Sequence, residues 1–509
     1  MPRRRSPSLI VADRPILSRS IFFVLGCLAT TAFAPVGWGF LAPLLLLPFL
    51  YACLTLSPRD ASQLALWFGF GLFLCGTYWI YISVHVFGEA PLWIAVLLMF
   101  GLVLLMSFYI WLTGWLISRL AIGEPWLLLI VAPAVWVSIE WLRGWALSGF
   151  PWLALGYSQI DLPLAGWAPV LGVYGVSIML LLSTTALVIS FRIRGRQQLV
   201  AIAIVLLPWI VGAGLGRVEW TESAGSMIQS TLVQGGVPQD QKWLPGQLQP
   251  TLDYYRRETQ LARTSEIVVW PEVAVPSLTD LVEDYIALLE ADSRATGQTI
   301  MFGILERTYV RNDKPTIYNS VVMLDGNRRQ IYRKRHLVPF GEYFPVPDRV
   351  REWLRMMSLP HNDLQAGADI QPLLVAANGA RVSVAICYED AYGAEQLYSM
   401  DDASLLVNVS NDAWFGDSIA PHQHLEIARM RALEVGRYVI RATNTGISAF
   451  IGPDGDILES GPQFQAASVT ASVEPRKGST PYMEWGNQPV IGWCLFIIAA
   501  FWLRARGSF

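Results

Sequence analysis

The stretch RVSVAICYED, residues 381–390, indicates how the polar part of the chain folds. Its first six residues, 381–386, are rich in Val and Ile and close to alternating, which is typical of a short buried strand. Cys387 stands where this strand should end, and residues 388–391 could open a helix. A thiol at that place is a candidate nucleophile, because the N–H groups at a helix start favour the thiolate. The simple alternative is a small buried core residue.

The composition of the 509-residue chain indicates a membrane protein. Hydrophobic residues make up 53% of the chain, 21 residues are Trp, and the mean hydropathy is +0.40. Apolar runs of about 20 residues, each long enough to cross a bilayer, account for this excess. With 37 basic and 40 acidic residues the net charge is only −3, which excludes the basic balance of a typical nucleic-acid-binding protein.

The apolar runs predict eight membrane spans, seven of them before residue 220. The first run has the features of a retained helix and also of a secretory signal peptide. We favour a retained helix, because apolar sequence resumes almost at once. The predicted spans are 20–34, 38–56, 62–84, 91–118, 125–142, 164–190, 198–215 and 489–503.

Basic residues alternate between the connectors and so predict an orientation. The first and third connectors contain no Lys or Arg, whereas the second, fourth and sixth connectors and the C-terminal tail do: Arg59, Arg119, Arg192, Arg194, Arg196, Arg504 and Arg506. Under the positive-inside rule both termini are then cytoplasmic and the long polar segment is extracytoplasmic, in the periplasm of a Gram-negative cell. The predicted domains are a transmembrane bundle over 1–219, an extracytoplasmic domain over 220–485, and a last span with a short tail over 486–509.

The fifth connector, WLRGWALSGFPW over 141–152, is an exception because it carries Arg143. Its Trp141, Trp145 and Trp152 are suited to a membrane interface, where indole rings settle at headgroup depth. Arg143 either belongs to this interfacial anchor or contacts the substrate.

Residues 220–485 have the pattern of an α/β domain. Short runs rich in Val and Ile alternate with helical stretches, and 277–296 and 421–437 have the spacing of amphipathic helices. The predicted strands are 230–234, 266–270, 299–303, 319–324, 382–386, 405–409 and 447–451.

Reactive side chains follow three of these strands or lie between them. Glu272 comes just after 266–270, Lys334 and Glu342 lie in YRKRHLVPFGEY (332–343), and Cys387 ends 382–386. A carboxylate, an ammonium and a thiol could together transfer an acyl group. The carboxylate takes the thiol proton, the thiolate attacks a carbonyl, and the ammonium stabilises the oxyanion. The other four cysteines lie in apolar segments: Cys27, Cys53, Cys75 and Cys494.

These motifs resemble the nitrilase superfamily and, within it, the bacterial apolipoprotein N-acyltransferase family. The resemblance covers nearly the whole chain and rests on LVQGGVPQDQKW (232–243), WPEVAVP (270–276), HLVPFGEY (336–343), CYED (387–390), NVSNDAWFG (408–416) and NTG (444–446). It implies a nitrilase-like αββα sandwich inserted between the seventh and eighth helices of the transmembrane bundle. It also implies the residues of the site: Glu272 as base, Lys334 as catalytic lysine and Cys387 as nucleophile, with supporting roles for Trp243, Glu342, Tyr388 and Glu389.

The resemblance further implies a ping-pong reaction in the cytoplasmic (inner) membrane of a bacterium. A membrane phospholipid donates a fatty acyl chain to Cys387, and the thioester passes it to the α-amino group of the N-terminal S-diacylglyceryl-cysteine of an apolipoprotein. No metal or cofactor is expected, because thioester exchange supplies its own driving force. Two alternatives stay open: a membrane-anchored amidohydrolase that uses water as acceptor, and a catalytically silent lipoprotein-binding module.

Three further features are open at this stage. His422 and His424 could hold a metal, but imidazoles at a helix start more often cap and pack. Arg333 and Arg335 could bind phosphate headgroups or could be a solvated charge run. Residues 343–360 combine apolar and basic side chains, which predicts either a mobile arm that dips into the bilayer or a helix packed on the domain core.

Overall fold

The computed structural model describes residues 14–309, 315–343 and 364–506, and these form two compact units. One unit contains the chain up to Tyr81, residues Leu92–Val218 and the chain from Trp485 onward. The other contains residues Glu219–Glu484 together with the short segment Ile82–Pro91. The polar segment therefore follows one set of helices in the chain and precedes a last helix.

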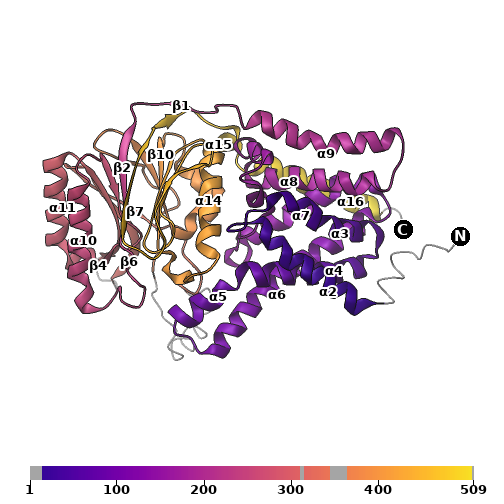
Figure 1. The fold of residues 1–509 in the computed structure, drawn as a ribbon, viewed down its shortest axis with the longest axis horizontal. Coiled ribbons are helices and arrows are strands. Elements are labelled where there is room, and N and C mark those ends of the chain that lie inside the picture. The colour runs from indigo at the N-terminus through magenta and orange to yellow at the C-terminus, as the bar shows by residue number, and fades with distance from the viewer. Residues whose placement is uncertain (1–13, 310–314, 344–363, 507–509) are drawn as a thin grey trace. The chain divides into compact units, whose positions relative to one another are not determined.

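The first unit is built of apolar helices, and each predicted span overlaps one of them. Within the described residues, five helical segments are long and apolar enough to cross a bilayer, and α4 with the stretch Trp79–Phe87 would make a sixth, bent by 48°. Two shorter apolar helices, Gly39–Thr55 and Gln488–Arg504, accompany them. The number that crosses a bilayer stays a prediction. The helices are α2 (Pro15–Ala29), α3 (Ala42–Thr55), α4 (Pro58–Thr77), α6 (Leu92–Ala121), α7 (Pro125–Trp145), α8 (Ala168–Ser190), α9 (Arg196–Leu215) and α16 (Gln488–Arg506) (Figure 1).

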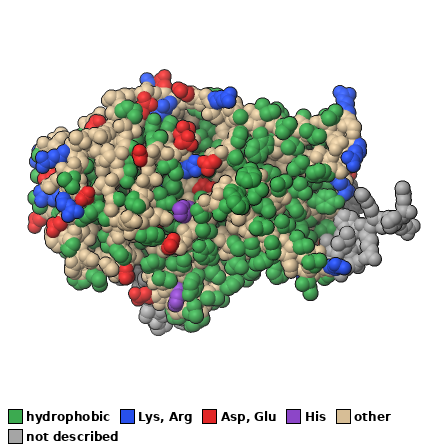
Figure 2. Space-filling view, in the orientation of Figure 1, with side chains coloured by type: hydrophobic (Ala, Val, Ile, Leu, Met, Phe, Trp, Pro, Cys, Tyr) green, Lys and Arg blue, Asp and Glu red, His purple; other side chains and the backbone are tan. Residues whose placement is uncertain are grey.

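Large apolar side chains stay exposed on this unit. Ile16 on α2 is 78% exposed, and Leu199 and Ile210 on α9 are 68% and 66% exposed. Figure 2 shows hydrophobic side chains covering most of the visible surface of the helical unit. Apolar surface of this extent is expected where lipid tails, and not water, surround a protein.

The segment after α7 differs from its prediction. Helix α7 continues to Trp145, so Trp141 and Arg143 lie on the helix and not in a connector. Arg143 is buried and donates hydrogen bonds to the carbonyl oxygens of Phe150, at 3.0 Å, and of Trp152. Trp152 is itself 1% exposed, which contradicts its predicted place at the membrane surface. Arg143 ties the helix end to the following chain, which favours a structural role over contact with substrate.

The second unit contains two large β-sheets. In the first, the strand order is β13-β12-β11-β10-β9-β8, and β9, β10 and β11 run parallel. Parallel neighbours place their carboxyl ends at the same edge of the sheet. Side chains that follow β9 and β10 therefore lie near one another. The strands are β8 (Leu374–Val375), β9 (Arg381–Ile386), β10 (Leu405–Ser410), β11 (Val439–Thr443), β12 (Ala449–Ile451) and β13 (Ile457–Ser460).

The second sheet has the order β14-β2-β3-β5-β6-β7, and β4 pairs with β5 outside this path. Strands β2, β3 and β5 are parallel, whereas β6, β7 and β14 are antiparallel to their neighbours. The strands are β2 (Ile228–Gln234), β3 (Ile267–Val269), β4 (Val275–Leu278), β5 (Thr299–Thr308), β6 (Thr316–Leu324), β7 (Arg329–Arg333) and β14 (Ala467–Val473). A separate ribbon pairs β1 (Glu222–Ser223) with β15 (Arg476–Lys477).

The two sheets pack face to face, and helices cover their outer faces. A buried cluster joins Leu232 and Ile267 of one sheet to Val384 and Val407 of the other. Helices α10 (Leu248–Leu261) and α11 (Glu283–Thr296) pack on the seven-stranded sheet, and α14 (Ala420–Val435) packs on the six-stranded sheet (Figure 1). The four layers are helix, sheet, sheet and helix. The predicted αββα sandwich is confirmed.

Several elements differ from the sequence-based expectation. The helix predicted over 277–296 begins only at Glu283, because Val275–Leu278 pairs with β5 as a strand. Helix α10 was not expected, and neither were strands β1, β4, β7, β8, β11, β13, β14 and β15. Strand β14 consists largely of Ala, Ser and Thr, and in β11 the charged Arg441 interrupts a short apolar run, so neither shows a continuous apolar pattern.

A core substitution tests the packing of the two sheets. Ile440 on β11 is fully buried between them. Ile440→Ala should lower the free energy of unfolding of this unit by about 2–5 kcal/mol, because the truncated side chain leaves a cavity. Leu458→Ala on β13, where the side chain is 44% exposed, should change it by less than about 0.5 kcal/mol. Thermal unfolding followed by circular dichroism measures the change in both variants. An equal loss of unfolding free energy in the two variants would contradict the assigned core.

Candidate active site

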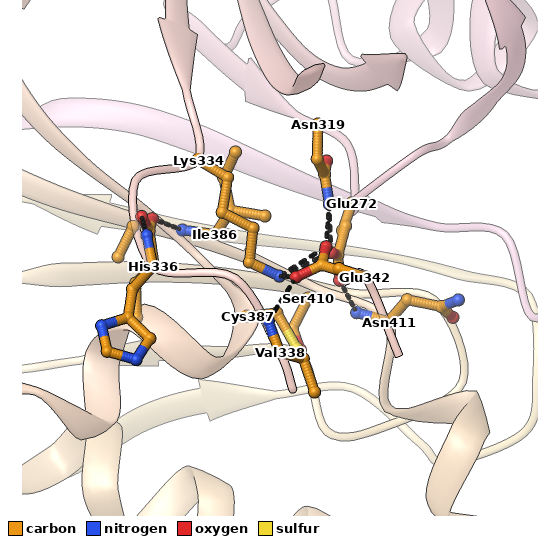
Figure 3. Close-up of polar contacts among 12 residues, drawn as sticks. Glu272, Asn319, Lys334, His336, Val338, Glu342, Ile386, Cys387, Ser410 and Asn411 are labelled. Atoms are coloured by element: carbon orange, nitrogen blue, oxygen red, sulfur yellow. Dashed lines mark hydrogen bonds and ion pairs between the residues drawn. The ribbon is translucent and has the colours of Figure 1, made fainter. Parts of the chain in front are cut away.

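The three residues predicted as catalytic come together in the second unit. Glu272 follows β3 after Trp270 and Pro271, Lys334 directly follows β7, and Cys387 directly follows β9. Figure 3 shows the Glu272 carboxylate, the Lys334 ammonium and the Cys387 sulfur turned toward one another. All three side chains are buried, with at most 9% of each residue exposed. The site therefore lies where elements of both sheets meet.

The Glu272 carboxylate is held by three donors. Its Oε1 accepts a hydrogen bond from Asn319 Nδ2 at 2.8 Å, and its Oε2 accepts one from the backbone N–H of Asn411 at 2.9 Å. Lys334 Nζ lies 3.5 Å from Oε1. These contacts fix the rotation of the carboxylate and leave it ready to accept a proton from a nearby group.

Lys334 is paired with two carboxylates. Its ammonium lies 2.9 Å from Glu342, in addition to its contact with Glu272. Glu342 also accepts hydrogen bonds from Asn319 Nδ2 at 3.0 Å and from the Val338 N–H at 2.7 Å, so it closes the loop that begins at the lysine. Burial alone would lower the pKa of Lys334, but Glu342 and Glu272 raise it above its usual value. The lysine is therefore a fixed positive charge at neutral pH.

The pKa of the Cys387 thiol is shifted in the direction opposite to the one predicted. Burial, followed by the negative charge of Glu272, raises the pKa of the Cys387 thiol well above its ordinary value, and Lys334 only partly opposes this. The expectation that the start of a helix favours the thiolate is wrong, because loss of water outweighs the short 3₁₀ turn Cys387–Ala391. The resting sulfur carries its proton. A base must remove this proton before the sulfur can attack.

Glu389 ties the backbone around Cys387 to the backbone after Lys334. Its side chain is fully buried and accepts hydrogen bonds from the N–H groups of Ile386 at 2.6 Å and Arg335 at 2.7 Å. The His336 N–H at 3.2 Å and the Tyr332 hydroxyl at 3.0 Å complete the set. One carboxylate thus joins the residue before Cys387 to the two residues after Lys334.

Tyr388 and Trp243 lie around this cluster. Tyr388 is half-buried and packs edge-on against His336, with ring centroids 5.9 Å apart, and against Tyr392, at 5.1 Å. His336 Nδ1 in turn lies 3.1 Å from Glu395. Trp243 is 50% exposed and lies on the loop after β2. Tyr388 and Tyr392 therefore offer aromatic surface beside His336, and Trp243 is next in the chain to Lys242, which contacts Glu272.

Four polar residues of the site were not predicted as functional. Asn319 and Asn411 orient Glu272, and Ser410 forms a side-chain hydrogen bond with Cys387. Lys242 is buried and donates a hydrogen bond to the carbonyl oxygen of Glu272 at 3.2 Å; burial lowers its pKa to about 8. Three of them lie in motifs quoted above, QKW and NVSND, which was the available signal. Asn319 lies in none of these motifs, and the sequence predicts only that it belongs to the strand 319–324.

The neighbours of Lys334 are engaged elsewhere. Arg333 forms an ion pair with Glu306 at 2.7 Å and lies over the Tyr318 ring, and Arg335 is buried and donates to the carbonyl oxygen of Asp369 at 3.1 Å. Neither belongs to a solvated charge run, and Arg335 does not face solvent as a headgroup ligand would. The predicted arm over 343–360 lies outside the described residues, except for Tyr343.

Comparison with known proteins identifies the family of this chain. The profile described as "Apolipoprotein N-acyltransferase N-terminal domain" matches residues 25–186, and "Carbon-nitrogen hydrolase" matches residues 231–481. The chain is 40% identical over 486 residues to an apolipoprotein N-acyltransferase of Methylococcus capsulatus, covering 94% of this chain and 95% of that protein. It is 42% identical over 495 residues to one of Azotobacter vinelandii, covering 95% and 94%. The chain belongs to the apolipoprotein N-acyltransferase family.

Family membership and the apolar helices together make this chain a membrane protein and an acyltransferase. A relative from Nitrosomonas europaea is 38% identical over 475 residues, covering 92% of this chain and 93% of that protein. Among solved structures, a CN-hydrolase superfamily protein from Xanthomonas campestris is 19% identical and covers 53% of this chain and 97% of its own, with a TM-score of 0.36.

Two substitutions should shift the pKa of Cys387 in opposite directions. Glu272→Gln removes a negative charge and should lower it, whereas Lys334→Met removes a positive charge and should raise it further. The rate at which iodoacetamide alkylates Cys387, read from the mass of its peptide at increasing pH, measures both shifts. Glu395→Gln, a carboxylate that pairs with His336, serves as control and should leave the profile unchanged. Shifts of the same sign in both variants would contradict this electrostatic arrangement.

Proposed function

We propose that this protein transfers a fatty acyl chain from a membrane phospholipid to the amino terminus of lipoproteins, through a thioester on Cys387. The observation that carries the proposal is the buried cluster of Glu272, Lys334 and Cys387 in a member of this family. The cluster offers a proton acceptor, a fixed positive charge and a nucleophile in one place.

In the first half-reaction Glu272 takes the proton of the Cys387 thiol, and the sulfur attacks the ester carbonyl of the phospholipid. The tetrahedral oxyanion forms next to the Lys334 ammonium, which stabilises it. When the ester bond breaks, Glu272 returns the proton to the leaving oxygen. The products are a thioester on Cys387 and a lysophospholipid.

In the second half-reaction the attacking group is an amine, where an amidohydrolase would use water. The α-amino group of the N-terminal S-diacylglyceryl-cysteine of an apolipoprotein, once deprotonated, attacks the thioester carbonyl. Lys334 stabilises the second oxyanion, and the proton released from the amine returns the sulfur to its thiol form. The result is an amide bond and a free Cys387. In this scheme the aromatic surface of Trp243 and Tyr388 receives the apolar parts of the substrates, and Glu342 and Glu389 hold the site together.

We further propose the setting of this reaction. The domains are the bundle over 1–219, the catalytic domain over 220–485 and the last span with its tail over 486–509. The alternation of arginines between connectors supports an arrangement with both termini in the cytoplasm and the catalytic domain outside the inner membrane. There the domain meets the phospholipids of the outer leaflet.

Incubation with phospholipid alone separates this proposal from the two alternatives. An acyltransferase should accumulate an acyl adduct on Cys387 that neutral hydroxylamine removes, an amidohydrolase should release fatty acid steadily, and a silent binding module should do neither. Cys387→Ala should abolish the adduct without changing the melting temperature. Intact mass of the protein in detergent micelles, with phosphatidylethanolamine as donor, is the measurement.

The base and the lysine are tested by the rate at which the adduct forms. Glu272→Gln should slow it by about 10²–10⁴-fold, because an amide cannot accept the thiol proton. Lys334→Met should slow it by about 10²–10³-fold through loss of an oxyanion partner. Glu306→Gln, which changes contacts with Arg333 and Ser320 and none with the three residues of the cluster, is the control. Rates within threefold of wild type in both active-site variants would refute the assigned roles.

Orientation is tested separately with a membrane-impermeant thiol reagent applied to the outer side of the inner membrane. It should label Leu288→Cys, at an exposed position of α11, and should not label Arg194→Cys in the sixth connector. The reverse pattern would overturn the proposed topology.

A further inference from the structure

A second buried cluster of charged side chains lies beside Cys387 and shares no member with the group around Lys334. Its members are Asp390 on the turn after β9, Asp412 after β10, His424 on α14 and Arg441 on β11. Each is at most 3% exposed. Four different elements therefore contribute to one polar centre, and the reaction described above uses none of them.

The four side chains form a closed ring of contacts. His424 Nδ1 lies 2.8 Å from Asp412, and its Nε2 lies 3.0 Å from Asp390. Arg441 bridges the same two carboxylates, at 3.2 Å to Asp390 and 3.0 Å to Asp412. An ionised carboxylate can only accept hydrogen bonds, so both ring nitrogens must donate and His424 is an imidazolium. Two positive charges then balance two negative ones inside the protein.

This ring contacts the nucleophile through the Cys387 carbonyl oxygen. His424 Nε2 lies 3.3 Å from that oxygen, and Asn408 Nδ2 donates to it at 3.4 Å. Arg441 donates to the Asn408 side-chain oxygen, which turns the amide nitrogen toward Cys387. Both donors to the carbonyl are thus oriented by the same ring. The backbone of Cys387 needs such support, because its φ of +51° is a left-handed conformation that is strained for a residue other than glycine.

The ring is also connected to the Cys387 sulfur, through the Ser410 hydroxyl. Ser410 donates a hydrogen bond to Asp412 at 2.7 Å and forms a side-chain hydrogen bond with Cys387. The carbonyl and the thiol of one residue are therefore both held by the same group of charges. A plain core histidine has no such connection to the reacting atom.

We propose that His424 is a positioning residue: held as an imidazolium between Asp390 and Asp412, it fixes the Cys387 backbone and so aims the thiol at Glu272 and Lys334. The inference rests on the proposed role of Cys387 as nucleophile. It corrects the expectation that His424 only caps and packs, since both of its ring nitrogens contact carboxylates.

The charge of His424 has a pH dependence that a packing role would lack. Burial and the nearby Arg441 lower its pKa, but Asp390 and Asp412 outweigh them and raise it to about 9. His424 is therefore charged at neutral pH and loses its proton as the pH rises through about 9. Burial would raise the pKa of Asp412, but His424 and Arg441 outweigh burial and hold this pKa below its usual range. His424 and Asp412 are therefore both charged at neutral pH.

The experiment compares acylation of Cys387 by 4-nitrophenyl butyrate in wild type, His424→Gln and His422→Gln, as full-length protein in detergent micelles. At about pH 7, His424→Gln should react about 10- to 100-fold more slowly than wild type, the effect of losing one charge-assisted hydrogen bond. At about pH 10, where wild-type His424 has lost its charge, the two rates should converge to within about threefold. His422→Gln, the same change two residues away on α14, should match wild type throughout. A pH-independent deficit, or none, would overturn the proposal.

A second variant keeps the proposal testable if His424→Gln does not fold. Asp390→Asn removes one of the two carboxylates that hold the imidazolium. The alkaline decline in acylation should then begin at least about one pH unit lower than in wild type, and an unchanged decline would overturn the role of His424. The small ester needs no membrane and no lipoprotein. If the protein did not use phospholipid, contrary to the proposed function, acylation by the small ester would still measure the effect of His424.

Discussion

The burial of one lysine is the constraint on which the site depends. Lys334 is 1% exposed, and a buried ammonium without partners would cost several kcal/mol. Glu342 and Glu272 supply the opposing charges, and Asn319 donates to both of them. The end of β7, the loop to Glu342 and the turn after β3 must therefore meet at one point. The arrangement that makes the lysine tolerable also aims it at the place where an oxyanion would form.

Cys387 is held by a different means, through its backbone. Cys387 adopts a left-handed conformation, and polar groups on both sides of it are occupied. Glu389 accepts the N–H of Ile386 on one side, while Asn408 and His424 reach the Cys387 carbonyl on the other. A residue in a strained conformation persists only where its surroundings determine it several times over. Charges that take no part in proton transfer thus decide where the sulfur lies.

The two units of the chain are suited to different solvents, and this explains the two patterns in the sequence. The helical unit leaves large apolar side chains such as Leu199 and Ile210 exposed, as lipid requires. The α/β unit buries its apolar residues between its two sheets and beneath the helices on their outer faces. Many of its charged groups form pairs or networks.

The sequence by itself determined the apolar helices and about half of the strands of the sandwich, because each follows from a local pattern, a long apolar run or a short Val- and Ile-rich run. Glu272 and Cys387 were found just beyond such runs, whereas Lys334 was found through the motif around it. Only the tertiary structure decided that Asn319 and Asn411 hold the Glu272 carboxylate, that Trp152 is buried, and that the Cys387 thiol keeps its proton. Asn411 lies 139 residues from Glu272 in the chain, and no local pattern connects them. Burial and charge depend on what lies around a group in space, and the residues nearest the sulfur come from distant parts of the chain.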